Sequence, residues 1–131
     1  MRYLLDTNTL IAILNDPRSP PSKRLRRHAP SDIAISSIVA HELYYGAFKS
    51  ARQVENVERV DALQLQIVSF DREDARHSGD MRAALARSGT PIGPYDILIA
   101  GQARSRNLVL VTNNIREFSR VPDLRIEDWH R

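Results

Sequence analysis

Three acidic residues stand at places in the sequence where a carboxylate is unusual. Asp6 ends a short apolar run, Glu42 falls on the apolar stripe of a predicted helix, and Asp96 lies in the first turn of another predicted helix. A buried carboxylate needs a partner, because an unpaired charge is costly in a protein interior. Several carboxylates brought together would suit a hard cation such as Mg²⁺ or Mn²⁺. A metal ion held in this way supports phosphodiester hydrolysis, since it acidifies water and stabilises developing negative charge.

Each acid also has a simpler interpretation. Asp6 is well placed to cap the helix that follows it, and acids at helix starts are favourable to the helix dipole. Thr7 and Asn8 are good N-cap residues as well, so we assign the cap to them, which leaves the Asp6 carboxylate for a ligand. His41 beside Glu42 is interpreted as surface, because adjacent residues of a helix point apart.

The elements that must position these acids alternate between strands and helices. Short apolar runs predict strands, and segments with helical periodicity or capping residues predict helices. The predicted strands are 2–5, 33–35, 66–68 and 108–111, with an edge strand within 124–129; the predicted helices are 10–14, 22–28, 38–50, 52–63, 71–88 and 95–105. In the long helix 71–88, the small residues Ala75, Gly79, Ala83 and Ala86 are predicted to face a neighbour. This alternation is typical of a parallel sheet covered by helices on both faces.

In such a fold the carboxyl ends of the strands and the starts of many helices share one edge of the sheet. Residues Thr112 to Asn114 follow the strand 108–111 at that edge. We therefore expect Asp6, Glu42, Asp96 and Asn114 to meet there. Three carboxylates crowded together would force some to stay protonated unless a cation compensates them.

Composition narrows the chemistry further. The 131 residues include no Cys, which excludes a disulfide framework, a thiolate metal site and a cysteine nucleophile, and fits a cytoplasmic protein. The formal net charge of +3 favours a polyanionic partner, although both basic clusters, around 23–28 and 72–87, are also compatible with ordinary solvated helices. No glycine-rich phosphate loop, nucleophile elbow or histidine metal motif is present. No segment predicts a signal peptide or a membrane span.

The motifs along the chain resemble those of the PIN-domain nucleases, specifically the toxin component of VapBC toxin–antitoxin pairs. The matching segments are residues 4–8, 36–46, 93–100 and 111–118, in the order of that family and across essentially the whole chain. The resemblance implies one PIN-like nuclease domain over residues 1–131, built as a three-layer α/β/α sandwich around a central parallel sheet. It also implies an endoribonuclease that depends on Mg²⁺ or Mn²⁺.

Three acids carry over from the family as catalytic residues and metal ligands, namely Asp6, Glu42 and Asp96. Many relatives have a fourth acid after the late strand, and by this resemblance the corresponding position here is Asn114. An amide adds no negative charge, which favours a site with one metal over a site with two. Asn8 and Thr112 would give supporting hydrogen bonds, as would Asn114.

The resemblance further implies a homodimer that a cognate VapB-type antitoxin inhibits in a larger hetero-oligomer. The antitoxin's C-terminal segment would enter near the acids, often with an Arg that pairs with them. Promoter DNA would be bound only through the antitoxin, and no membrane is involved. The expected substrate is a structured RNA, with transfer RNA cut in the anticodon region as the specific expectation.

Two other functions fit the same sequence. The missing fourth acid would also suit a non-catalytic PIN-like module that binds RNA or an antitoxin as a regulator. A DNA nuclease of the flap type is the third, although the chain lacks the insertions that would clamp a DNA junction.

Overall fold

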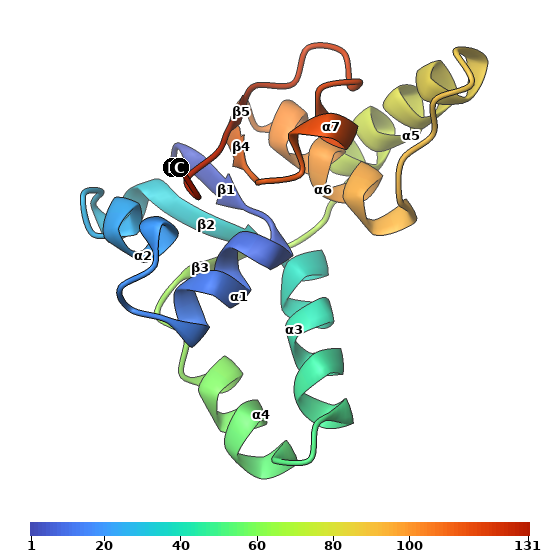
Figure 1. Ribbon diagram of the computed structural model, residues 1–131. Helices are drawn as coiled ribbons and strands as arrows, with labels where there is room; N and C mark the ends of the chain where they lie inside the picture. Colours follow the sequence, from blue (N-terminus) through green and yellow to red (C-terminus); the bar gives the residue numbers. More distant parts are fainter.

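The computed structural model describes all 131 residues and contains a five-stranded, wholly parallel sheet (Figure 1). The strand order is β3-β2-β1-β4-β5. The strands are β1 (Tyr3–Leu5), β2 (Ile33–Ser36), β3 (Gln66–Val68), β4 (Val109–Val111) and β5 (Ile126–Glu127). The predicted strands and their parallel arrangement are therefore confirmed, with β3 and β5 at the two edges.

Helices connect the strands and cover the sheet. They are α1 (Thr7–Asn15), α2 (Pro20–Leu25), α3 (Ser37–Lys49), α4 (Gln53–Asp61), α5 (Arg72–Arg87), α6 (Pro94–Ser105) and α7 (Ile115–Phe118), with a 3₁₀ turn at Pro30–Asp32. Helix α2 begins two residues before the predicted start because Ser19, and not a later residue, caps it. The pair α3–α4 forms a hairpin that projects away from the sheet (Figure 1). No helix has both the length and the apolar content needed to cross a membrane.

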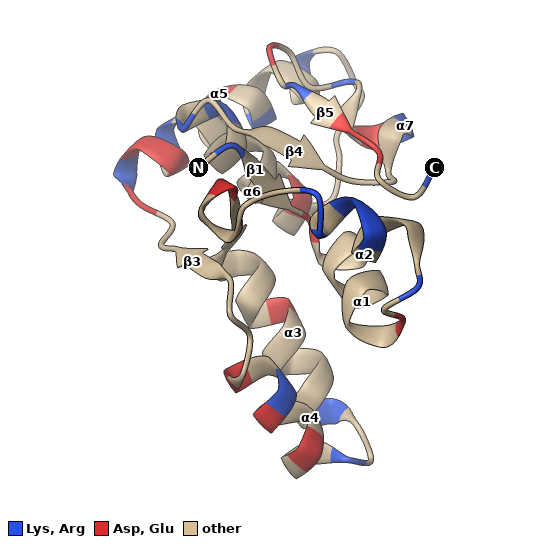
Figure 2. Ribbon diagram, turned by 90° about the vertical axis from the view of Figure 1, so that its left-hand side faces the viewer, with Lys and Arg blue, Asp and Glu red and all other residues tan.

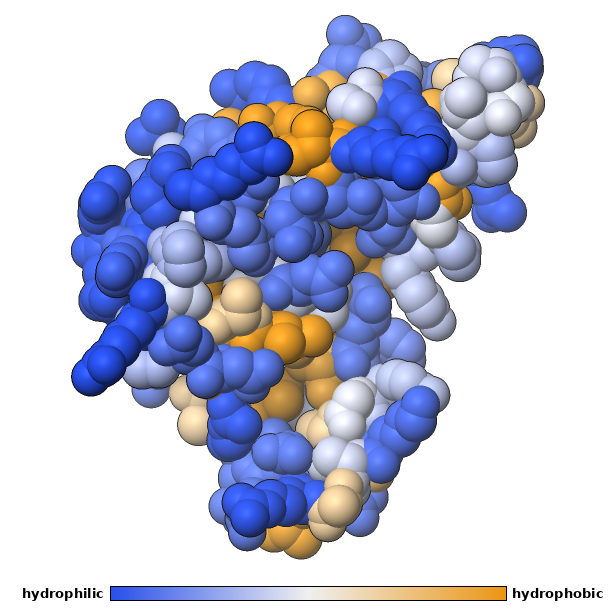
Figure 3. Space-filling model, in the orientation of Figure 1, coloured by the Kyte–Doolittle hydropathy of each residue, from blue (hydrophilic) through white to orange (hydrophobic).

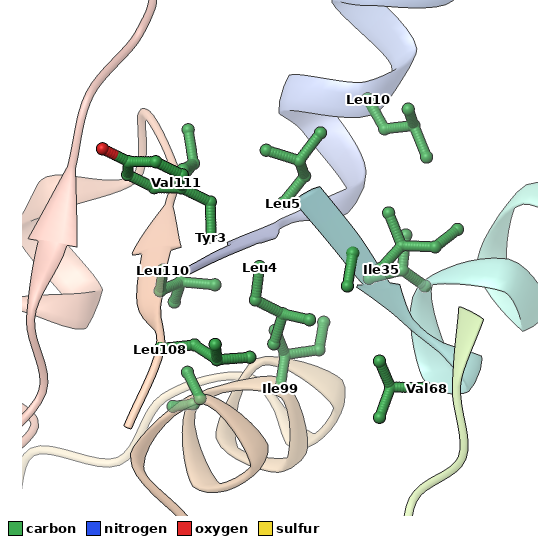
Figure 4. Packing of buried hydrophobic residues seen from close by; sticks show 14 of the residues in the cluster. Tyr3, Leu4, Leu5, Leu10, Ile35, Val68, Ile99, Leu108, Leu110 and Val111 are labelled. Atoms are coloured by element: carbon green, nitrogen blue, oxygen red, sulfur yellow. The ribbon is translucent and has the colours of Figure 1, made fainter. Parts of the chain in front are cut away.

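Alternate residues of the strands supply the two sides of the core, as the period of two in a strand requires. In Figure 4, Leu4 and Leu110 lie on the side of Ile99 from α6, whereas Leu5 lies on the side of Leu10 from α1. All five side chains are almost completely buried. The sheet is thus the middle layer of an α/β/α sandwich, which confirms the expected fold class.

The face that α5 turns inward differs from the prediction. Its buried residues are Asp74, Ser78, Met81 and Leu85, while the small residues Ala75, Gly79, Ala83 and Ala86 are exposed. The prediction was wrong because it assumed that small apolar residues mark the packed face. Polar residues pack inward here because α6 supplies partners for them.

Asp74 shows how a polar residue is accommodated on the buried face of α5. Its carboxylate accepts hydrogen bonds from the side chains of Gln102, Ser105 and Arg106, and from the backbone N–H of Asp71. Burial alone would raise the pKa of Asp74, but the hydrogen bonds, led by the one from Arg106, hold that pKa below its usual range.

Close packing of α5 on α6 depends on a glycine of α6. A Cβ on Gly101 would lie 2.5 Å from the Cβ of Ser78 and 2.6 Å from its Cα, so the two helices approach through the space that Gly101 leaves.

One edge of the sheet collects the polar residues. The strands β1, β2 and β4 end there at Leu5, Ser36 and Val111, in neighbouring positions of the ladder. Helices α1, α3 and α7 begin at this edge because each follows a strand closely. Helix α6 also begins there, because a helix that leads into a parallel strand runs antiparallel to it.

Candidate active site

Asp6 is buried, with 5% of its surface exposed, at the junction of β1 and α1. Its Oδ1 accepts a hydrogen bond of 2.8 Å from the backbone N–H of Thr9, which makes Asp6 the N-cap of α1. Assigning the cap to Thr7 and Asn8 was therefore wrong. The cap fixes the carboxylate in place through Oδ1, and Oδ2 accepts no hydrogen bond from the protein.

Thr7 does not cap α1 but holds the side chain of Glu42. As the first residue of α1, it donates a hydrogen bond of 2.9 Å from Oγ1 to Oε1 of Glu42. Glu42 is half-buried, with the buried residues Val39 and Leu43 beside it on α3. The carboxylate of Glu42 is thus held against the start of α1, next to Asp6, as its place on an apolar stripe predicted.

Asp96 completes the predicted group from the opposite layer. Burial raises its pKa most, and the charge and hydrogen bond of Glu117 raise it further, followed by the charges of Asp6 and Glu42. Together they raise the pKa of Asp96 from 3.8 to about 6. Glu117, Asp6 and Glu42 thus lie close enough to Asp96 for their charges to raise its pKa, which adds a fourth acid, Glu117, to the predicted group.

Glu117 was missed in the sequence. It lies on α7, three residues after Asn114, whose side-chain Nδ2 donates a hydrogen bond of 2.6 Å to Glu117 Oε2. Asn114 therefore holds a further acid in place, and Glu117 adds negative charge beside Asp96 that the amide of Asn114 does not supply. The preference for a single metal, which was inferred from Asn114, stays a prediction. An acid within the short helix that follows a late strand was the available signal.

Of the other two predicted supporting residues, Thr112 forms a hydrogen bond within the site and Asn8 does not. Thr112 is fully buried, and its Oγ1 accepts a hydrogen bond of 2.9 Å from the backbone N–H of Asn114, which shapes the turn into α7. Asn8 is exposed and forms no side-chain hydrogen bond within the protein. The structure therefore gives Thr112 a clear positioning contact and Asn8 none.

The four carboxylates have the donor chemistry that a divalent cation requires. None of them forms an ion pair with a Lys, Arg or His side chain, and the raised pKa of Asp96 reflects first its burial and then the negative charge of the other acids. Carboxylate oxygens are the ligands that Mg²⁺ and Mn²⁺ prefer. As the side chains stand, no three of them are arranged to enclose an ion. Binding of an ion would therefore require these side chains to move.

Comparison with known proteins agrees with this geometry. The family model described as PIN domain matches residues 3–124. The chain is 46% identical to the tRNA(fMet)-specific endonuclease VapC of Salmonella typhimurium, with 98% of each chain covered. It is 39% identical to Ribonuclease VapC2 of Rickettsia felis over the full length of both.

The chain belongs to the VapC ribonucleases of the PIN-domain family. Its structure is also similar to a chain in the crystal structure of DNA-bound VapBC from Salmonella typhimurium, with a TM-score of 0.93, 46% identity and 98% of each chain covered. The VapBC2 complex of Rickettsia felis bound to a promoter DNA fragment gives a TM-score of 0.90 at 38% identity, over 98% of this chain and 99% of the other. The expected family, fold class and ribonuclease activity are thus confirmed.

An apolar groove adjoins the acids of this PIN domain, and a basic surface lies on α2. An apolar groove of about 280 Å³ runs between α1, α3 and α4, with Glu42 at its wall and Ile11, Leu43 and Val60 among its lining residues. It is visible as the apolar patch beside the α3–α4 hairpin in Figure 3. Helix α2 and its neighbouring turns carry several Lys and Arg residues near the C-terminus (Figure 2).

Proposed function

We propose that this chain is the toxin of a type II toxin–antitoxin pair, and that it cleaves structured RNA with a divalent cation held by Asp6, Glu42, Asp96 and Glu117. We treat residues 1–131 as one nuclease domain acting in the cytoplasm, where its RNA substrates are. The observation that carries the proposal is the convergence of four carboxylates without a basic partner at the carboxyl edge of the sheet.

In this mechanism the residues of the chain position charge and protons. Asp6 is held by its cap bond to Thr9, and Glu42 is oriented by Thr7 until a ligand replaces that contact. Asp96, with its pKa raised to about 6, changes protonation easily near neutral pH and loses its proton when positive charge arrives. Mg²⁺ or Mn²⁺, when bound, would supply that charge and lower the pKa of the water that attacks phosphorus.

Transfer RNA is the proposed substrate. Two relatives, from Salmonella typhimurium and Shigella flexneri, are named tRNA(fMet)-specific endonucleases and are 46% and 43% identical to this chain. We therefore propose initiator tRNA, cut in its anticodon region, as the target. The basic residues of α2 would bind its phosphates. Arg24 of this helix forms an ion pair of 3.4 Å with Glu127 on β5. The backbone of Glu127 is in turn hydrogen-bonded to that of Thr112.

A VapB-type antitoxin is the proposed inhibitor, in a hetero-oligomer built on a toxin homodimer, with promoter DNA contacted through the antitoxin. The apolar groove between α1, α3 and α4 would receive its C-terminal segment. Glu42 at the groove wall and the acids beyond it would pair with a basic side chain of that segment.

Purified protein incubated with initiator and elongator tRNA in Mn²⁺ tests the activity. We expect a single cut in initiator tRNA that disappears in EDTA and in Asp6→Asn. Asp16→Asn, an exposed acid at the other end of α1, is the matched control and should cleave like the wild type. Cleavage that persists unchanged in EDTA, or in Asp6→Asn, would refute the mechanism. Absence of cleavage of any RNA would favour the non-catalytic regulator.

A further inference from the structure

Two aromatic residues directly precede two of the acids in the sequence, one from each layer of the sandwich. His41 precedes Glu42 on α3, and Tyr95 precedes Asp96 on α6. Their ring centroids are 5.8 Å apart, with an angle of 53° between the planes. The pair therefore bridges the two helices that deliver two of the four carboxylates.

Both rings are open to solvent. Tyr95 is 47% exposed and His41 is exposed, and neither side chain takes part in a hydrogen bond within the protein. Because the rings meet at an angle and do not stack face to face, ring surface is left available for a third aromatic group. The pair of Tyr3 and Trp129 differs in this respect, since both rings are buried and belong to the core.

The backbone holds this pair in place. Tyr95 is the second residue of α6, directly after Pro94, whose ring fixes its own φ angle at the helix start. His41 lies in the second turn of α3. Consecutive Cα atoms are about 3.8 Å apart, so each ring is anchored within one residue of a carboxylate.

We propose that His41 and Tyr95 form a stacking platform for a nucleobase next to the scissile phosphate of the RNA. This inference rests on the proposed ribonuclease function and adds to it a pair of substrate-positioning residues. Sequence-specific RNA recognition generally uses unstacked bases of loops, which stack on exposed aromatic side chains. In this proposal, the base that adjoins a phosphate bound at the acids stacks on these two rings.

A further exposed aromatic residue lies on the same face of α3 as His41. Tyr45 and Lys49 follow His41 at intervals of four residues, and therefore lie on one side of the helix. Tyr45 is 61% exposed, and the Lys49 ammonium lies 5.5 Å from the centre of its ring. A cation next to an exposed ring suits a strand of stacked bases and phosphates. This charge favours single-stranded RNA over a wholly apolar protein contact.

Variants of Tyr95 test the platform with initiator tRNA as the probe. Stacking of one base on an aromatic side chain corresponds to a loss of roughly 5- to 150-fold in kcat/KM when the ring is removed. We expect such a loss for Tyr95→Ala, mainly in KM, and a smaller loss for His41→Ala. Tyr95→Phe, which keeps the ring, should recover most of the activity lost in Tyr95→Ala. Ile67→Ala, an exposed apolar residue on the edge strand β3, is the control and should match the wild type.

A spectroscopic measurement separates stacking from a structural effect. We would place 2-aminopurine beside the mapped cleavage position of an anticodon stem-loop and bind it to the Asp6→Asn variant in EDTA. Stacking should quench its fluorescence, and the quenching should be absent when Tyr95→Ala is added.

Three results would overturn the platform. The first is cleavage by Tyr95→Ala within twofold of the wild type, and the second is unchanged quenching. The third is a loss of activity that accompanies a change in oligomeric state by light scattering, which would make the rings a protein contact. If the wild type cleaves no RNA, the proposed function fails and the platform fails with it.

Discussion

Replacing Asp96 by Asn should stabilise the metal-free protein while it abolishes the activity. Asp96 is half-buried, and its pKa is raised from 3.8 to about 6 by burial and then by Glu117, Asp6 and Glu42. A raised pKa means that the folded protein holds the proton more tightly than the unfolded chain does. Above pH 6 the group is ionised in both states, and the folded state bears the full cost of the charge.

The cost can be estimated from the pKa. A rise from 3.8 to about 6 corresponds to about 3 kcal/mol of unfolding free energy. Because solvent screens a half-exposed carboxylate, we expect about 1–3 kcal/mol. An Asn at position 96 has nearly the same shape, carries no charge, and can still donate a hydrogen bond to Glu117. The variant should therefore gain most of this amount at pH 7.5 in EDTA.

The predicted gain in stability of Asp96→Asn depends on pH. Below pH 3.8 Asp96 is neutral in both the folded and the unfolded state, so its contribution vanishes and the two proteins should differ little. Between pH 4 and 6 the unfolded chain ionises first, so the wild type loses stability relative to the variant as the pH rises. Above pH 6 the difference should be constant.

Urea denaturation of both proteins in EDTA at pH 4, 5, 6 and 7.5 measures this difference. Asp80→Asn serves as the control of opposite sign, since Arg104 holds the pKa of Asp80 below its usual range. Asp80→Asn should bring no gain at any pH. Added Mn²⁺ should raise the Tm of the wild type and leave that of Asp96→Asn nearly unchanged. If Asp96→Asn were no more stable than the wild type at pH 7.5, or gained equally at pH 4, the electrostatic reasoning would be refuted.

Three further predictions concern positions around the site and the helix layer behind it. Glu117→Gln should lower kcat by about 100-fold or more, and Asn114→Ala by about 10- to 100-fold, because the second variant only releases the Glu117 carboxylate; tRNA cleavage under single-turnover conditions measures both. Gly101→Ala should cost about 1–3 kcal/mol because its Cβ would collide with α5, whereas Gly79→Ala, with open space around it, should gain about 0.5–1 kcal/mol by urea denaturation. Asp74→Ala should lower stability by about 3 kcal/mol in the same assay, since it removes the buried carboxylate that accepts hydrogen bonds from Gln102, Ser105 and Arg106.

Much of the site followed from the sequence because local patterns carry it. A short apolar run that ends in Asp6 can only be a strand leading to a helix, and parallel strands present their carboxyl ends together. Glu42 was conspicuous because a charge on an apolar stripe needs a partner. Asp96 was identified by its place after Pro94. These three signals lie within single elements, so the sequence alone indicated that Asp6, Glu42 and Asp96 share an edge of the sheet.

The tertiary structure decided what depended on contacts between distant elements. Glu117 is an ordinary acid of a short helix in the sequence, and it becomes part of the site only because α7 folds back over the start of α6. The face that α5 buries was also settled from outside the helix, since Gln102 and Arg106 of the α6 segment satisfy Asp74 and draw it inward. The division has one physical cause: periodicity and capping act over a few residues, whereas charge repulsion and buried hydrogen bonds act between residues that only the folded chain brings together.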